Sequence, residues 1–159
     1  MKKLFMLFML TLLVAVPASV CAQGAKQSQQ AAVDPDLEKD SLHNLEVARH
    51  YFKLRKAYVA ALQRCEEIIA GNPTFSRIDE VLFIAGQSSV NLADGKGKQK
   101  SSLYVIHEAD TKRTLKPDEF RDLARDYFSQ LVKTYPDSLF RSQAETELGA
   151  LGGPRATKQ

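Results

Sequence analysis

Two stretches of the chain repeat one spacing of a small residue, two larger apolar residues and a proline. The intervals are four, three and five residues in both sets, which are Ala61, Cys65, Ile68, Pro73 and Ala124, Phe128, Leu131, Pro136. In an antiparallel helix pair, a small residue lets two backbones approach, larger residues on the next turns fill the groove, and proline ends the helix. The spacing therefore predicts two helices that each pack against an antiparallel neighbour.

Apolar residues at intervals of three and four extend this pattern along the chain and predict an all-α fold of about five amphipathic helices. Gly71 and Pro73 end the second helix, and Ser76 with Asp79 predicts a capping box at the start of the third. Pro117 and the two acidic residues after it predict the start of the fourth helix. The predicted helices cover roughly 36–54, 58–69, 78–92, 117–132 and 139–151.

The segment 94–116 interrupts the helical pattern, and we predict that it is an inserted loop. It opens with alternating glycines and lysines, and its β-prone residues 103–106 predict a short strand or hairpin. We interpret Lys96, Lys98 and Lys100 as a flexible, solvated part of this loop.

The N-terminus has the pattern of a secretory signal. Lys2 and Lys3 precede an apolar run over 4–16, and small residues follow up to Ala22, where cleavage is predicted. Residues 23–36 are polar and are predicted to form a flexible linker, and 152–159 a disordered tail. Lipid anchoring at Cys21 is the alternative, but Val20 precedes this cysteine where a lipoprotein signal has a small residue. We therefore expect a periplasmic or secreted protein.

Charge and cysteine content exclude several classes of protein. Removal of 1–22 leaves 20 basic and 19 acidic residues, so the basic excess that nucleic-acid binding requires is missing. Acidic residues are interleaved with basic ones along the predicted helices, which argues against binding to an anionic membrane, and no stable membrane insertion is expected after signal removal. Cys65 would be the only remaining thiol, which excludes an intramolecular disulfide and fits a buried small hydrophobe better than a nucleophile.

The first repeated unit resembles a tetratricopeptide repeat, which is a helix–turn–helix of about 34 residues. A second unit is split by the insertion, with 78–92 as its first helix and 120–135 as its second. The junction Tyr135-Pro136-Asp137-Ser138 and the segment Ala57–Ala61 leading to Pro73 resemble BamD-like domains of bacterial outer-membrane assembly lipoproteins. The residues that carry the first-unit resemblance are Leu45, Ala48, Phe52, Tyr58, Ala61, Cys65, Ile68 and Pro73.

The resemblance implies a short α-solenoid of tetratricopeptide-like hairpins over 37–151. It also implies a periplasmic adaptor without catalytic chemistry or cofactor, which binds protein partners of the cell envelope, for example in outer-membrane protein assembly. Stacked hairpins present the first helix of each pair on their concave side. The polar and aromatic residues that stacking does not require are therefore the candidate protein-binding residues, namely Asn44, Arg49, Tyr51, Gln87 and Asn91.

Two alternatives remain at this point. A short array of two repeats leaves apolar ends, so a self-associating structural domain is the first alternative. An envelope hydrolase or metal enzyme is the second. It would use His107, or His43 and His50 with Glu46 between them on one helical face. We expect no metal, because further ligands at suitable spacing are missing around these histidines.

Overall fold

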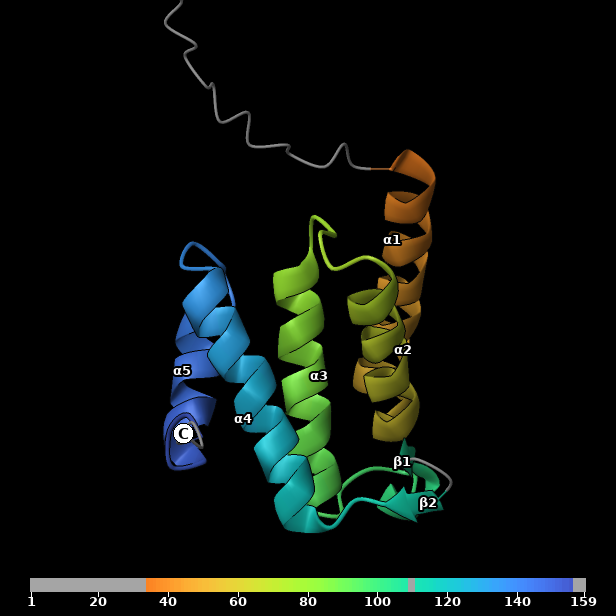
Figure 1. The fold of residues 1–159 in the computed structure, drawn as a ribbon, viewed down its shortest axis with the longest axis vertical. Helices are drawn as coiled ribbons and strands as arrows, with labels where there is room; N and C mark the ends of the chain where they lie inside the picture. The colour runs from red at the N-terminus through yellow and green to blue at the C-terminus, as the bar shows by residue number, and fades with distance from the viewer. Residues whose placement is uncertain (1–33, 109–110, 156–159) are drawn as a thin grey trace, which may run out of the picture. The chain divides into compact units, whose positions relative to one another are not determined.

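The computed structural model describes residues 34–108 and 111–155. The predicted signal segment 1–22 with Cys21, the linker up to residue 33 and the last four residues lie outside this part. The described chain is mostly helical, which confirms the all-α prediction, and its only sheet has two strands (Figure 1). Its elements are α1 (Pro35–Arg49), π-helical η1 (His50–Arg55), α2 (Tyr58–Gly71), α3 (Ile78–Ala93), 3-10 helical η2 (Ser101–Leu103), β1 (Val105–Glu108), β2 (Thr111–Thr114), α4 (Pro117–Thr134) and α5 (Arg141–Ala150).

Consecutive helices lie side by side and run in alternating directions (Figure 1). Helix α2 packs against α1 and α3, and α4 packs against α3 and α5, while α1 also reaches α3. One apolar cluster fills the space between α1, α2 and α3, with Tyr104 and Phe120 at its lower end. A second cluster joins α3 to α4 and α5 and is centred on Leu82, Phe128 and Leu148. Helix α3 contributes to both clusters and therefore forms the middle of the stack.

The small residues of the repeated spacing lie where the helices meet. Ala61 on α2 and Ala124 on α4 are both fully buried, and the prolines that end the two spacings are exposed at turns. Ala48 on α1 is buried. The ring of Phe52 on η1 packs against the ring of Tyr58, and their centroids are 5.5 Å apart. The other large residues of the two spacings are buried as well, namely Cys65, Ile68, Phe128 and Leu131.

The first helix starts earlier and ends differently from the prediction. Asp34 caps α1, because its carboxylate accepts hydrogen bonds from the backbone N–H groups of Asp36 and Leu37. The predicted linker therefore extends two residues too far. The helix continues past Arg49 as the π-helical turn η1 and ends at Lys56, whose φ of 54° reverses the chain before α2.

The capping box predicted at Ser76 and Asp79 is wrong. The N-cap position of α3 is Arg77 instead of Ser76, and no side chain caps this helix end. The Ser76 N–H donates to the carboxylate of Glu38 at 3.3 Å, and Asp79 accepts a hydrogen bond from the Ser138 hydroxyl at 2.6 Å. The second contact joins the first turn of α3 to the α4–α5 turn, which gives the serine of the Tyr-Pro-Asp-Ser junction a physical role.

The insertion contains a β-hairpin, which is one of the two forms predicted for its β-prone residues. Strand β1 pairs antiparallel with β2, with Val105 opposite Thr114 and His107 opposite Lys112. Helix α4 then begins at Pro117, and the Glu119 side chain accepts a hydrogen bond from the Lys116 N–H at 2.7 Å.

The last helix, α5, is shorter at both ends than the predicted range 139–151. Helix α5 begins at Arg141 instead of Leu139, whose side chain is 92% exposed. The predicted tail starts with a turn in which Gly153 donates to the Leu148 carbonyl, and Arg155 forms an ion pair with Asp126. Residues 152–155 are thus held against the helices, and 156–159 lie outside the described chain.

Helices α3 and α4 approach so closely that the contact requires a glycine. A Cβ atom added at Gly86 would lie 2.5 Å from the ring of the fully buried Phe128. We expect Gly86→Ala to lower the free energy of unfolding by about 1–3 kcal/mol through overpacking. Gly71→Ala is the matched control, because a Cβ there meets nothing within 4 Å. Urea unfolding measures both variants, and a Gly86→Ala protein as stable as the control would contradict the close approach.

Candidate functional site

The five candidate binding residues lie on two helices that contact each other. Asn44, Arg49 and Tyr51 are on α1 and η1, and Gln87 and Asn91 are on α3. The structure therefore brings the first helices of the two predicted hairpins together. The hydrogen bonds of each side chain determine which of the five remain available to a partner.

Arg49 is committed to the contact between α1 and α3. Its Nε and Nη2 atoms donate to the two carboxylate oxygens of Glu80, each at 2.6 Å. Arg77 adds a third bond to the same carboxylate at 2.7 Å, and the Glu80 side chain is only 8% exposed. Burial opposes ionisation of Glu80, but the hydrogen bond and charge of Arg49 outweigh it and lower the pKa of the carboxyl group. This ion pair removes Arg49 from the free binding residues.

Gln87 and Asn91 are also used within the fold. The Gln87 side-chain amide donates to the Glu147 carboxylate on α5 at 2.8 Å. The Asn91 side-chain amide donates to the backbone carbonyl of Gln87 at 2.7 Å. The first of these bonds ties α3 to α5. Neither side chain is fully exposed.

Tyr51 lines a pocket of about 460 Å³ at the end of α1. The other lining residues are Val47, His50, Arg55, Ala57 and Lys98. Within this set Arg55 donates to the imidazole of His50 at 3.3 Å, and no lining residue carries a carboxylate. Asn44 is half-buried about two turns earlier on α1. The pocket combines an aromatic ring with two cations, a surface suited to a carboxylate- or phosphate-bearing group beside an apolar one.

Sequence analysis missed the contribution of Lys98 to this pocket. Lys98 follows Gly97, whose φ is 94° and whose Cβ, if present, would lie 2.6 Å from the Lys56 carbonyl oxygen. The Lys98 N–H donates to that same carbonyl at 2.9 Å. The glycine therefore lets the inserted loop approach the end of η1, and the Gly-Lys-Gly-Lys pattern was the local signal for this approach.

A half-buried carboxylate anchors the insertion to the helices. Oε1 of Glu66 on α2 accepts hydrogen bonds from the Tyr104 hydroxyl at 2.6 Å and from the Tyr127 hydroxyl at 3.1 Å. No cation pairs with Glu66 in the described chain, and burial raises the pKa of its carboxyl group although both hydroxyl bonds lower it. Burial also raises the pKa of both tyrosines. This contact joins α2, α4 and the start of the hairpin.

The residues considered for catalysis or metal binding are not assembled into a site. His43 and His50 are exposed, and no three His, Cys, Asp or Glu side chains in the described residues are grouped so that they could hold a metal ion. His107 is exposed on β1 opposite Lys112. Cys65 is fully buried. Burial raises the pKa of its thiol and so disfavours the reactive thiolate form.

The raised pKa of Glu66 predicts a pH-dependent stability. The folded protein favours protonated Glu66 more than the unfolded chain does, so this residue stabilises the fold below its ordinary pKa of 4.5, and that stability is lost as the pH rises through the raised value. Glu66→Gln keeps an oxygen that accepts both tyrosine hydrogen bonds but carries no charge. We expect its stability relative to the unmodified protein to increase between pH 4 and pH 8, the interval chosen to bracket this titration.

Denaturant unfolding at several pH values measures this difference. Glu67→Gln is the control, because Glu67 is half-exposed in a surface ion pair with Arg64 and contributes little in either charge state. A Glu66→Gln protein whose stability relative to the unmodified chain did not change with pH would show that the fold does not raise the pKa of Glu66.

Comparison of the chain with models of protein families, with curated proteins and with solved structures gave no match. No helix in the described residues is long and apolar enough to cross a membrane.

Proposed function

We propose that this chain is a tetratricopeptide-like adaptor exported to the bacterial cell envelope, and that it binds a segment of another envelope protein along α1 and α3. The pocket around Tyr51 is the observation that carries the proposal, because it opens beside the first helix of the stack. The alternating helix directions, the contact between α1 and α3 and the buried Ala61 and Ala124 support a hairpin array. The signal-like residues 1–22 support export.

The chemistry of the pocket narrows the expected partner segment. The side chains of Asn44 and Tyr51 form no hydrogen bond to another described residue, so their polar groups are available, whereas the side chains of Arg49, Gln87 and Asn91 are engaged within the fold. An extended segment with an apolar side chain beside a carboxylate would fit Tyr51, Arg55 and Lys98. Assembly of outer-membrane proteins is the process in which we propose that this adaptor takes part.

The two alternatives have less support. The exposed side chains of α5, which ends the stack, are mainly polar, namely Ser142, Gln143, Glu145 and Thr146. Self-association would have to use Leu139 before α5, or Leu37 and Leu42 on the other outer helix, α1. A metal enzyme would require His107, or His43 with His50, to be grouped with further ligands, and no group of three or more His, Cys, Asp or Glu side chains that could hold a metal ion is present among the described residues.

Site-specific photo-crosslinking tests the adaptor proposal. A photoreactive phenylalanine analogue at Tyr51 or Asn44 should give a discrete protein adduct in cells of the native host. The same analogue at Gln63, which is exposed on α2, should not give this adduct. We expect Arg55→Glu to reduce the Tyr51 adduct by about tenfold through loss of a charge-assisted contact.

The adduct pattern distinguishes the proposals. Equal labelling from Gln63 and Tyr51, or no adduct from Tyr51 and Asn44, would contradict binding along α1. An adduct formed only with a second copy of the chain would favour the self-associating domain instead.

A further inference from the structure

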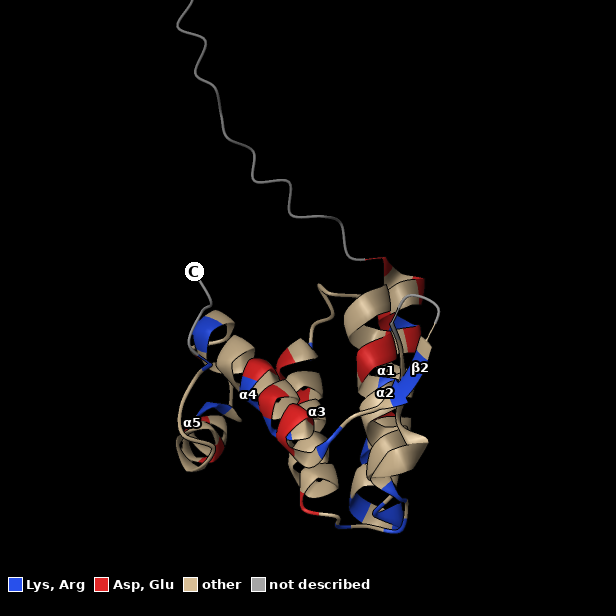
Figure 2. Cartoon of the chain, turned by 60° about the horizontal axis from the view of Figure 1, so that its bottom comes forward, with Lys and Arg blue, Asp and Glu red and all other residues tan. Residues whose placement is uncertain are grey.

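Five exposed basic side chains gather at one end of the helix stack, which we call the cationic end. Two chain segments supply them, 50–56 and 95–107, and neither contains an acidic residue. Figure 2 shows basic residues at the foot of α1 and α2, on the loop below them and on β2. The residues of the cationic end are Lys53, Arg55, Lys56, Lys98 and Lys100.

The two segments are fixed to each other, in contrast to the flexible loop expected from sequence. The backbone bond from Lys98 to Lys56 joins them, and the Gln99 side chain accepts a hydrogen bond from the Ala60 N–H at 3.1 Å, at the start of α2. A side chain at position 97 would collide with the Lys56 carbonyl and the Tyr58 ring. The fold thus holds cations from distant parts of the sequence close together, despite their mutual repulsion.

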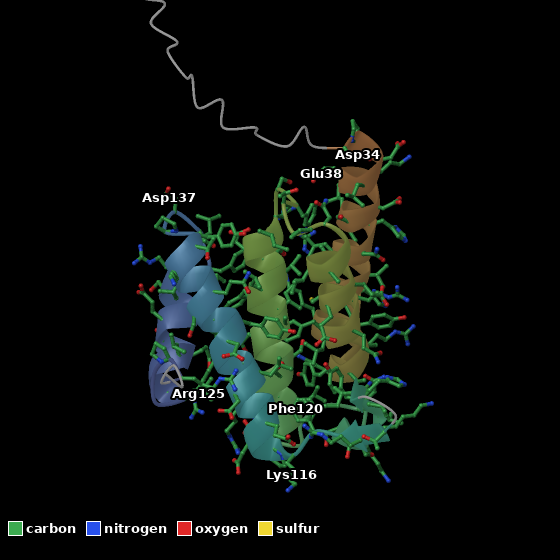
Figure 3. All side chains as sticks on the ribbon, in the orientation of Figure 1. Asp34, Glu38, Lys116, Phe120, Arg125 and Asp137 are labelled. Atoms are coloured by element: carbon green, nitrogen blue, oxygen red, sulfur yellow. The ribbon has the colours of Figure 1, made fainter. Side chains whose placement is uncertain are left out.

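Carboxylates do not neutralise this group. No carboxylate pairs with Lys56, Lys98 or Lys100 within the described part of the chain, whereas the nearby Asp94 is paired with Lys96 and Arg121. Figure 3 labels Asp34, Glu38 and Asp137 at the opposite end of the stack, far from Lys116. Acidic residues also lie at the start of α4, where Asp118 pairs with Arg121 and Glu119 pairs with Arg113.

Exposed aliphatic side chains accompany the cations. Leu54, between Lys53 and Arg55, is 70% exposed, and Leu103, in η2 after the lysine loop, is 59% exposed. Basic residues around protruding aliphatic ones are typical of surfaces that contact the interface of an anionic bilayer. The cations lie near lipid phosphates, and the aliphatic groups enter the boundary between headgroups and acyl chains. An acidic protein surface would attract the cations but would not by itself explain two solvent-exposed leucines.

We propose that the cationic end binds the surface of a membrane rich in anionic phospholipid, with Leu54 and Leu103 in the interface. This contact is peripheral, and it does not depend on the adaptor role. A segment held in the Tyr51 pocket would then lie close to the membrane, because Arg55 and Lys98 belong to both surfaces.

Vesicle co-sedimentation tests the proposal with the chain from Gln23 onward, which contains every residue of the two apolar clusters. The protein should sediment with vesicles of phosphatidylglycerol and phosphatidylcholine at low salt, and much less with pure phosphatidylcholine or at high salt. Lys98→Gln with Lys100→Gln should weaken this binding by about 10- to 30-fold. The matched control, Lys39→Gln with Lys133→Gln, removes the same charge from exposed positions elsewhere and should bind nearly as well as the unmodified protein.

Leu54→Ser separates the apolar contribution from the electrostatic one. It should weaken binding to the anionic vesicles without changing the net charge, and thermal melts should show that the variant is folded. Equal binding to both vesicle types, or equal loss in the test and control pairs, would overturn the proposal. Binding to polyglutamate without binding to anionic vesicles would also overturn it and would assign the cationic end to an acidic protein.

Discussion

The rest of the structure depends on the burial of α3 along most of its length. Eleven of its sixteen residues are buried, including Gly86, two serines and the carboxylate of Glu80. Burial of polar groups in such a helix is costly unless they find partners within the protein. The Ser89 hydroxyl donates to the Ala85 carbonyl at 2.9 Å, whereas the buried Ser88 hydroxyl has no partner among the described residues. Glu80 is therefore paired with Arg49 from α1, and Gly86 leaves the space that the Phe128 ring of α4 fills.

These packing requirements limit the surface that is available for binding. Arg49 and Gln87 look like free polar residues in the sequence, but each connects α3 to another helix. Of the five candidate binding residues, only Asn44 and Tyr51 have side chains without a hydrogen bond to another described residue, and Tyr51 lines the pocket next to the end where the inserted loop approaches η1. The approach of the inserted loop to η1 places Lys98 in the pocket and also creates the cationic end. Both proposed binding surfaces therefore depend on the backbone contact between Lys98 and Lys56, next to the positive φ angles of Lys56 and Gly97.

Local spacing predicted the helices because burial recurs every three or four residues, and the burial of Ala61 and Ala124 follows that period. Contacts between distant residues left no such periodic signal. Arg49 is 31 residues from Glu80, and Glu66 is 38 and 61 residues from its two tyrosine partners. The capping box failed partly for the same reason, because the Asp79 carboxylate accepts a hydrogen bond from Ser138, 59 residues away, and α3 begins one residue later than a Ser76 cap requires. The cationic end was hidden because its two segments are separated by α2 and α3 in the sequence.

Amide hydrogen exchange followed by mass spectrometry tests the central position of α3 most directly. If α3 is the enclosed helix on which the others pack, peptides covering Val81–Ser89 should be among the slowest to exchange and should open only with global unfolding. Peptides from α5 and from the β-hairpin should exchange sooner, because more of their residues are exposed. Exchange in α3 as fast as in α5 would contradict the account, since it would mean that the helix stack does not close around α3.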